Sequence, residues 1–378
     1  MTAAADPAAR ALLDEIQEWV ELESPTDQPA AVNRLVSLIE DQLRGLDLAV
    51  RRDPVPGFGD RLVARLGPDE PGILVLNHLD TVWPIGTRGF EVDGDRAHGP
   101  GVYDMKAGAV IALAALRHVV ESGSALPITM VYTPDEEVGS PRCGPFVTEL
   151  ARANRCVLVF EPSGPHGAVK TSRSGTGRFR LTVHGRAAHS GADHAAGRSA
   201  IAELARHILE LESLTDHAEG TTLNVGVVSG GTRANVVPAQ AQASIDIRAR
   251  TAAAMARLVA ALDARAPGRD GLRLDLDGAV TRPPFEAATS AGLFAEAATV
   301  AATAGITLQA THSDGASDGN LTAAAGVPTL DGLGAVGGGA HADHEHILVS
   351  QLPARVRLAT ALLAGLTTTN HGTEGHPR

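Results

Sequence analysis

Five residues along the chain have side chains of the kinds that hold divalent metal ions. They are His78, Asp104, Glu137, Glu161 and His341. Zinc and similar ions bind imidazole nitrogen and carboxylate oxygen, and one carboxylate can bridge two ions. A metal ion also lowers the pKa of a bound water to about 7, which makes that water a nucleophile. These residue types therefore predict metal-assisted hydrolysis.

Two further acids suit supporting roles in the same chemistry. Glu136 directly precedes Glu137, and we predict that Glu136 is the general base that accepts a proton from the attacking water. Asp80 closely follows His78, and its carboxylate is expected to accept the second ring N–H of that imidazole. Neighbouring side chains of an extended segment point to opposite sides, so a turn near Gly139 must bring both glutamates to one site.

Each candidate is weak evidence when taken alone. A pair of adjacent glutamates is more often a solvent-exposed helix surface, and an aspartate such as Asp104 before a helix is more often an N-cap. Glu161 precedes a proline, as the last residue of a strand often does, and His341 lies in a polar stretch that is rich in histidine. The prediction therefore depends on the joint order and placement of the whole set.

Three continuous apolar runs of strand length precede the candidate residues. They are residues 72–76, 128–132 and 156–160. Continuous apolar character fits strands that are buried on both faces, as in a parallel sheet. The first run leads into His78, the second into Glu136 and Glu137, and the third into Glu161. Because sites in open α/β sheets form at the carboxyl ends of the strands, we expect these residues at one edge.

The spacing of apolar residues predicts helices from about Pro7 to Leu48 and from about Met105 to Ser122. After about Ser172 the pattern changes to β-α-β-β-α-β, which suggests a ferredoxin-like insert. We therefore expect an α/β fold with a mixed, mostly parallel sheet flanked by helices and an inserted α+β domain. The expected boundaries are 1–173 and 285–378 for the catalytic domain and 174–284 for the insert. The polar tail 367–378 is predicted to be disordered.

The composition excludes several other classes of protein. The 378 residues are 44% hydrophobic, which is enough for the core of one large or two smaller domains. The formal charge of −12, with no block of lysine or arginine, argues against nucleic acid as a partner. Cys143 and Cys156 are too few for a disulfide scaffold. With no signal peptide or membrane-spanning stretch in the sequence, we expect a cytoplasmic protein with no membrane partner.

Taken in order, the motifs around these residues resemble the M20 metallopeptidase family, and within it the glutamate carboxypeptidase (carboxypeptidase G) type. The matching segments are HLDTV (78–82), HGPGVYDMK (98–106), TPDEEVGS (133–140), FEPS (160–163), HGRAAHSG (184–191), NVVP (235–238) and GAHAD (339–343). The resemblance extends from about residue 10 to residue 365, and the ordered set of motifs is highly specific.

The resemblance implies a pair of zinc ions in each subunit, with cobalt or manganese as other possible metals. Asp104 would bridge the two ions. His78 and Glu161 would complete one metal site, and Glu137 and His341 the other. Glu136 would be the general base, and Asp80 would orient His78.

The resemblance also implies that the insert is a lid and a dimerisation domain. His189 would reach the active site of a neighbouring subunit and stabilise the oxyanion. Asn235 and Arg248 would hold the carboxylate of the substrate, since the planar fork of an arginine suits that group. Arg282 is a further candidate for this role. Ser317 lies in a segment that resembles a glycine-rich substrate loop.

The predicted reaction is hydrolysis of an amide bond next to a free carboxylate, in an N-acyl amino acid or a short peptide. Asn77, Tyr103 and Ala107 depart from the residues common in the family, which leaves the substrate open. The first alternative is an N-acyl amino-acid deacylase of the acetylornithine or succinyl-diaminopimelate type, which has nearly the same metal ligands. Remote alternatives are a catalytically inactive binding protein on the same scaffold and a purely structural assembly module.

Overall fold

The computed structural model describes residues 7–124 and 126–366, which form two compact units. Unit 1 contains the described residues of Met1–Thr171, Ala287–Ser313 and Ser317–Arg378. Unit 2 contains Ser172–Glu286 and Asp314–Ala316. Sequence analysis had placed the insert at 174–284. The tail 367–378, for which disorder was predicted, lies outside the described residues.

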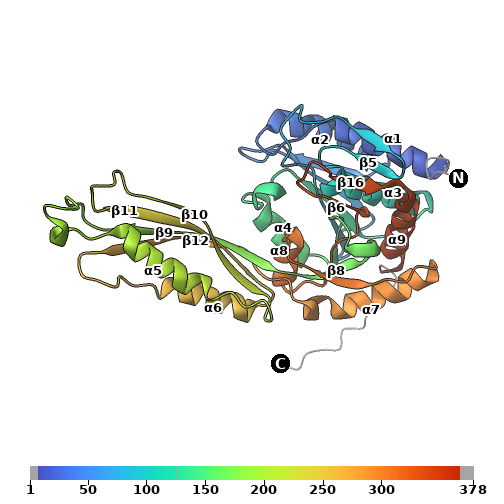
Figure 1. Ribbon diagram of the computed structural model, residues 1–378. Coiled ribbons are helices and arrows are strands. Elements are labelled where there is room, and N and C mark those ends of the chain that lie inside the picture. Colours follow the sequence, from blue (N-terminus) through green and yellow to red (C-terminus); the bar gives the residue numbers. More distant parts are fainter. Residues whose placement is uncertain (1–6, 125, 367–378) are drawn as a thin grey trace, which may run out of the picture. The chain divides into compact units, whose positions relative to one another are not determined.

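A six-stranded sheet forms the centre of unit 1 (Figure 1). The order of its strands is β1-β2-β6-β3-β7-β14. Its strands are β1 (Ala49–Asp53), β2 (Arg61–Leu66), β3 (Ile73–His78), β6 (Ile128–Thr133), β7 (Cys156–Val159) and β14 (Thr329–Leu330). Strands β6, β3, β7 and β14 run parallel, whereas β1 and β2 are antiparallel to their neighbours. This confirms the mixed, mostly parallel sheet. Every residue of β3, β6 and β7 is buried, as the continuous apolar runs predict.

Helices cover both faces of this sheet. They are α1 (Pro7–Glu21), α2 (Pro29–Arg44), α3 (Ala107–Glu121), α4 (Cys143–Arg152), α7 (Ala287–Thr303), α8 (Asp318–Ala324) and α9 (Leu352–Gly365). Ile73 and Val75 of β3 belong to the core that α1, α2, α3 and α9 share. Leu74 and Leu76 point to the other face and pack with Val147 of α4. The alternation of side chains along each strand therefore gives the unit two apolar layers.

A second, smaller sheet of unit 1 brings two loops of the candidate site together. Its strands, in the order β15-β16-β5-β4, are β15 (Gly337–Gly338), β16 (His346–Leu348), β5 (Arg96–His98) and β4 (Glu91–Asp93). Residue His98 pairs with His346 across β5 and β16. The loop 99–104 follows His98 and the loop 339–345 precedes His346, so the two loops leave the sheet side by side. A further two-stranded sheet contains β8 (Val169–Arg173) and β13 (Ala310–Ser313).

The long helix α3 begins slightly later than the sequence predicts. The expected start was Met105, but Val102–Lys106 form a wide, irregular turn and the regular helix begins at Ala107. Gly101 enters this turn in the left-handed region, with φ of 71°, and Asp104 has non-helical angles. The side chain of Asp104 is therefore presented by a turn and not by the first turn of a helix.

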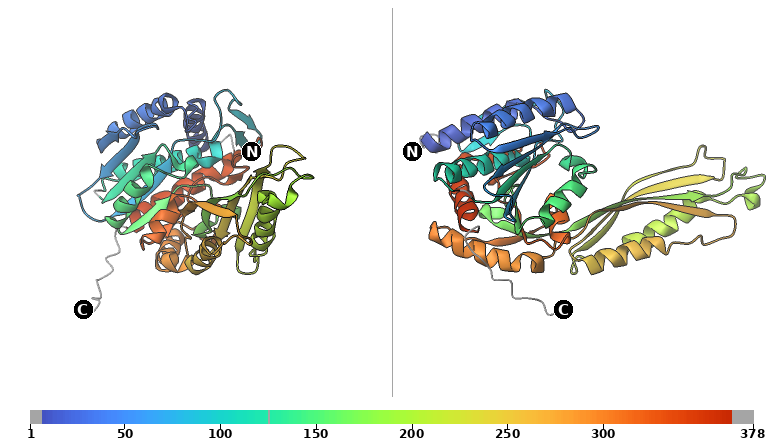
Figure 2. Two further views of the ribbon diagram at one scale, coloured as in Figure 1. Left: turned by 90° about the vertical axis from the view of Figure 1, so that its left-hand side faces the viewer. Right: turned by 180° about the vertical axis from the view of Figure 1, so that it is seen from behind.

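Unit 2 has the predicted β-α-β-β-α-β order (Figures 1 and 2). Its elements are β9 (Gly175–His184), α5 (Ala200–Glu212), β10 (Thr221–Gly230), β11 (Gln240–Ala249), α6 (Ala252–Asp263) and β12 (Arg273–Arg282). The sheet is antiparallel throughout, in the order β10-β11-β9-β12, and both helices lie along one of its faces. Ser199 caps α5 by accepting a hydrogen bond from the Ala202 backbone N–H.

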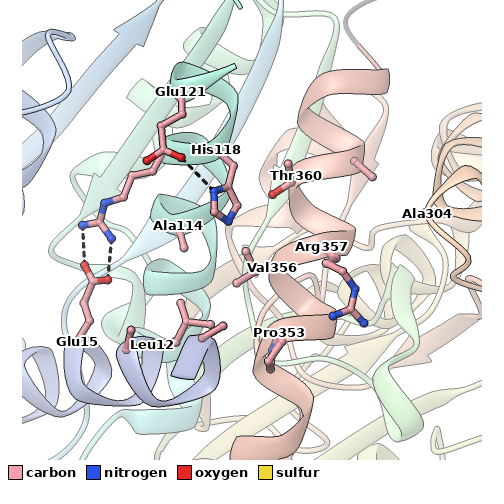
Figure 3. A pocket seen from close by; sticks show the side chains of 14 residues that line it. Leu12, Glu15, Ala114, His118, Glu121, Ala304, Pro353, Val356, Arg357 and Thr360 are labelled. Carbon is pink, nitrogen blue, oxygen red and sulfur yellow. Dashed lines mark hydrogen bonds and ion pairs between the residues drawn. The ribbon is translucent and has the colours of Figure 1, made fainter. Parts of the chain in front are cut away.

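An apolar pocket of about 780 Å³ lies in unit 1 among α1, α3 and α9 (Figure 3). At its rim, both guanidinium Nη atoms of Arg117 donate to the Glu15 carboxylate at 2.7 Å. None of the candidate metal ligands lines this pocket. No helix in the described part of the chain is both long and apolar enough to cross a membrane.

Two glycines in helices provide a matched test of this packing. A Cβ on Gly108 of α3 would lie 1.9 Å from the Phe160 carbonyl oxygen, whereas a Cβ on Gly292 of α7 would meet no atom within 4 Å. Gly108→Ala is expected to destabilise the protein by about 1–3 kcal/mol because the helix must move away from the sheet. Gly292→Ala is expected to leave stability unchanged or to raise it by about 0.5–1 kcal/mol. Thermal unfolding of the two variants measures the difference, and equal melting temperatures would contradict this packing.

Candidate metal centre

The ends of three parallel strands bring candidate residues to one edge of the central sheet. His78 is the last residue of β3 and pairs with Thr133, the last residue of β6. A short 3₁₀ turn, Glu136–Val138, follows β6, and Glu161 follows β7. The turn ends at Gly139, which adopts φ of 96°. Adjacent parallel strands therefore position three of the candidate ligands, His78, Glu137 and Glu161. The chain also turns at Gly139, as Glu136 and Glu137 require if both are to reach one site.

The carboxylate of Asp104 lies between two imidazoles. Its Oδ1 is 3.2 Å from His78 Nε2, and its Oδ2 is 3.3 Å from His341 Nε2. On the first side, Glu161 Oε1 lies 3.4 Å from His78 Nε2. On the second side, Glu137 Oε2 lies 3.1 Å from His341 Nε2. The five candidate ligands thus form two groups that share Asp104, with one of its oxygens directed to each.

Glu136 is close to the first of these groups. Ligand-type atoms of His78, Glu136 and Glu161 all lie within 4.8 Å of one another, and the same holds for His78, Asp104 and Glu137. Both sets are candidate metal-binding clusters. Both glutamates thus lie near His78, and Glu137 in addition contacts His341.

Asp80 lies beside His78, and its carboxylate also makes other contacts. His78 Nδ1 lies 3.0 Å from the Asp80 carbonyl oxygen and 3.5 Å from the nearer carboxylate oxygen, so the carbonyl is the closer acceptor. The Asp80 carboxylate accepts hydrogen bonds from the backbone N–H groups of Glu136 and Glu137, both at 3.1 Å. It also accepts one from the Thr26 hydroxyl at 2.8 Å. The buried Asp80 therefore holds the turn that carries the acid pair.

The electrostatics of the centre reflect carboxylates that are buried beside one another. Burial raises the pKa of Glu137 to about 7; the neighbouring Asp104 charge adds to this rise, and the hydrogen bond with His341 opposes it. Hydrogen bonds with Asp104 and Glu137 raise the pKa of His341 to about 11 despite its partial burial. Burial alone would raise the pKa of Asp104, but the bonds from His341 and His78 hold it well below its usual range. The centre therefore attracts positive charge.

The residues fit divalent metal ions. Glu137 Oε1 is buried and has no hydrogen-bond partner among residues 7–124 and 126–366. A buried carboxylate oxygen without a donor is costly unless a cation neutralises it. Imidazole nitrogen and carboxylate oxygen are also the donor set that zinc accepts. His78 and Glu161 would hold one ion, His341 and Glu137 a second, and Asp104 would contact both.

The candidate substrate residues of unit 2 fall into two groups at opposite ends of its sheet. His189 and Asn235 lie near one end, where Ser190 N donates to the Asn235 carbonyl oxygen and His189 bridges to Val236. Arg248 and Arg282 lie at the other end, where both pair with Thr176 in the strand register. A strand of ten residues such as β11 spans roughly 30 Å. One copy of unit 2 therefore does not bring the two groups together.

Ser317 is fully buried in unit 1. Its hydroxyl donates to Asp331 and accepts the Gly319 backbone N–H, which caps α8. These bonds give the hydroxyl a structural role, and substrate binding by Ser317 stays a prediction.

Sequence analysis missed two polar residues that support the centre. Thr26 bonds Asp80 from the loop after α1, and the buried Glu345 accepts the backbone N–H of Asp104. A buried hydroxyl or carboxylate leaves no periodic signal. The only available sign was that Glu345 lies in the histidine-rich stretch that begins at His341.

An α/β fold that gathers imidazoles and carboxylates at the ends of parallel strands defines a metallohydrolase. The chain belongs to peptidase family M20/M25/M40, whose profile matches residues 74–365. This confirms the resemblance found in the sequence. The protein is thus a carboxypeptidase-like hydrolase of the metallopeptidase class.

Individual relatives agree with this assignment. Carboxypeptidase G2 of Pseudomonas sp. (strain RS-16) is 28% identical over 370 residues, which cover 94% of this chain and 89% of that protein. The crystal structure of the aminopeptidase PepT from Bacillus cereus superposes with a TM-score of 0.81 at 23% identity, over 95% of this chain and 98% of that one. The YXEP protein of Bacillus subtilis, described as a dinuclear metal-binding peptidase of the M20 family, has a TM-score of 0.71 at 17% identity, over 97% of this chain and 100% of that one. The two structures support the fold.

Removal of metal tests the candidate centre. Dialysis against a chelator is expected to lower the melting temperature, because buried carboxylates lose their neutralising cations. Return of Zn²⁺ at about 100 times its dissociation constant is expected to restore about 2.7 kcal/mol of stability per site. Asp104→Asn should abolish most of this gain, since it removes charge from both groups. A melting temperature that is insensitive to both chelator and Zn²⁺ would contradict metal binding here.

Proposed function

We propose that this protein is a dinuclear, zinc-dependent hydrolase that cleaves an amide or peptide bond next to a free carboxylate, most like a glutamate carboxypeptidase. The observation that carries the proposal is Asp104, whose two oxygens face His78 and His341 separately. That arrangement suits one carboxylate between two ions. Cobalt or manganese would accept the same ligands, so they are alternatives to zinc.

Bound divalent ions would supply Lewis acidity and lower the pKa of a water near the reacting carbonyl. Glu136 accepts a proton from the attacking water and delivers it to the leaving nitrogen. The Asp80 carboxylate keeps Glu136 in place through the Glu136 backbone N–H. Glu137, the other member of the pair, faces His341 and acts as a ligand. The two glutamates therefore have different roles although they are adjacent in sequence.

His189 is proposed to stabilise the oxyanion. It is exposed, and its Nδ1 accepts hydrogen bonds from the backbone N–H groups of Gly191 and Ala192, at 3.1 and 3.0 Å. A neutral imidazole that accepts at Nδ1 carries its proton at Nε2. His189 is thus set to donate from Nε2, as an oxyanion requires.

Substrate carboxylate binding is proposed for Arg248, together with Asn235 and Arg282. Arg248 is oriented by the Asp246 carboxylate at 3.0 Å and by the Asp314 carbonyl oxygen at 2.9 Å. These contacts use Nε and Nη1 of the guanidinium. The Nη2 atom can still bond a carboxylate of the substrate.

We further propose a homodimer in which His189 and Asn235 serve the active site of the partner. The separation of these residues from Arg248 along unit 2 supports this arrangement. Large apolar side chains are also exposed on α5 and β10 of unit 2, which suits an interface. They are Ile201, Leu209, Val227 and Val228. A cytoplasmic location stays a prediction.

The general-base role of Glu136 is tested by substitution. Glu136→Gln keeps the size of the side chain but removes its proton acceptor, so turnover is expected to fall by about 10²–10⁴. Metal content should remain that of the unmodified protein, as measured by atomic absorption. Glu149→Gln on the exposed surface of α4 is the control and should keep full activity. Near-normal turnover of the metal-loaded Glu136→Gln protein would disprove the role.

The substrate class is tested by hydrolysis of a series of N-acyl amino acids with one acyl group and C-terminal Glu, Asp, Ala or Orn. The metal-reconstituted protein is expected to prefer Glu over Asp by roughly tenfold or more, the effect of one methylene in a fitted pocket. A preference for Orn would instead favour the N-acyl amino-acid deacylase. Absence of any turnover by metal-loaded protein would favour an inactive binding protein.

A further inference from the structure

Glu345 is a buried carboxylate with no assigned part in the reaction. Its side chain has no exposed surface. Oε1 accepts hydrogen bonds from the backbone N–H groups of Tyr103 at 2.9 Å and Asp104 at 3.1 Å. Oε2 accepts one from Trp83 Nε1 at 2.6 Å and one from Gly101 N at 3.3 Å. Both oxygens of one anion are therefore bound by two N–H groups each.

All four partners of the Glu345 carboxylate are donors, so its ionised form fits the site. Burial raises the pKa of Glu345, and the N–H groups oppose that rise. Three of the four donors belong to the turn Gly101–Asp104. A turn whose successive N–H groups converge on one anion has little freedom to move. The contact with Glu345 therefore acts directly on the backbone of Asp104.

Glu345 also connects the loops that carry the other candidate ligands. It lies four residues after His341, within the same loop, and its backbone N–H donates to the Ala342 carbonyl oxygen at 2.8 Å. The Trp83 donor follows the segment that contains His78 and Asp80. The Glu345 carboxylate thus joins the segment after β3, the turn Gly101–Asp104 and its own loop. The first of these segments follows His78, and the other two contain Asp104 and His341.

We propose that Glu345 is a positioning residue that sets the spacing between the two halves of the metal centre by fixing Asp104 relative to His78 and His341. This inference rests on the proposed metal-dependent function. Glu345 itself does not face the ligand atoms, because its two oxygens are occupied by N–H groups. Its effect therefore reaches the metal through the position of Asp104 and not through coordination.

The test is metal affinity in Glu345→Gln. The amide offers one acceptor oxygen in place of two, and its NH₂ group faces N–H donors, so the turn is expected to loosen. Zn²⁺ affinity, measured by competition with a chromophoric chelator, is expected to weaken by about 10- to 100-fold, as for other residues that hold metal ligands in place. The visible absorption bands of the Co²⁺-substituted protein should shift, since the geometry around the ions changes.

Glu203→Gln is the matched control. Glu203 is also buried, at 6% exposure, and accepts the backbone N–H of Gly268 at 2.7 Å and the Arg206 guanidinium at 2.6 Å, but it lies on α5 in unit 2. This variant is expected to lower the melting temperature of the metal-free protein and to leave Zn²⁺ affinity and the Co²⁺ spectrum unchanged. Equal weakening of Zn²⁺ binding in both variants would assign the effect to general destabilisation and overturn the proposal.

Trp83→Phe keeps the test valid if Glu345→Gln fails to fold. It removes one donor and retains the three backbone donors, so several-fold weaker Zn²⁺ binding is expected. Unchanged affinity in whichever of these variants folds would disprove the positioning role while leaving the proposed function intact. An unmodified protein that binds no Zn²⁺ would instead contradict the proposed function itself.

Discussion

Buried negative charge is the constraint on which the rest of unit 1 depends. Five carboxylates are gathered near the carboxyl ends of β3, β6 and β7: Asp80, Asp104, Glu137, Glu161 and Glu345. Two unit charges 4 Å apart interact by about 4 kcal/mol at an effective dielectric constant of 20, so the fold must compensate each of them. Asp80 and Glu345 are compensated by N–H and O–H donors. The other three face imidazoles, and divalent ions would supply the remaining positive charge.

The two donor-bound carboxylates determine the geometry of the others. Asp80 receives the N–H groups of Glu136 and Glu137, and Glu345 receives those of the turn that ends at Asp104. Each carboxylate therefore stabilises an irregular loop, because it accepts backbone N–H groups that would otherwise be paired within a helix or a sheet. Glycines with positive φ, such as Gly101 and Gly139, let the chain turn so that successive N–H groups point inward. The two loops are in this way tied to buried carboxylates by backbone hydrogen bonds.

The sequence predicted the central sheet, because β3, β6 and β7 are continuous apolar runs. It also predicted that the residues after these strands lie close together, because parallel strands end at one edge of a sheet. It did not predict the start of α3. Asp104 has non-helical backbone angles, and its N–H donates to Glu345, which is 241 residues away in the sequence. The bonds of Asp80 to the acid pair and the burial of Ser317 were missed for the same reason. These contacts join distant segments, and no local pattern of residue types records them.

The order of the loops along the chain has a consequence for how the protein is made. His78, Asp104, Glu137 and Glu161 precede unit 2, whereas His341 and Glu345 follow it. Chains fold from the N-terminus during synthesis, and domains generally fold as units. Unit 2, whose strands pair only with one another, can thus be complete while the ribosome still holds the segment with His341 and Glu345. In the proposed centre, the group around His341 would therefore be completed last, after unit 2 has been made.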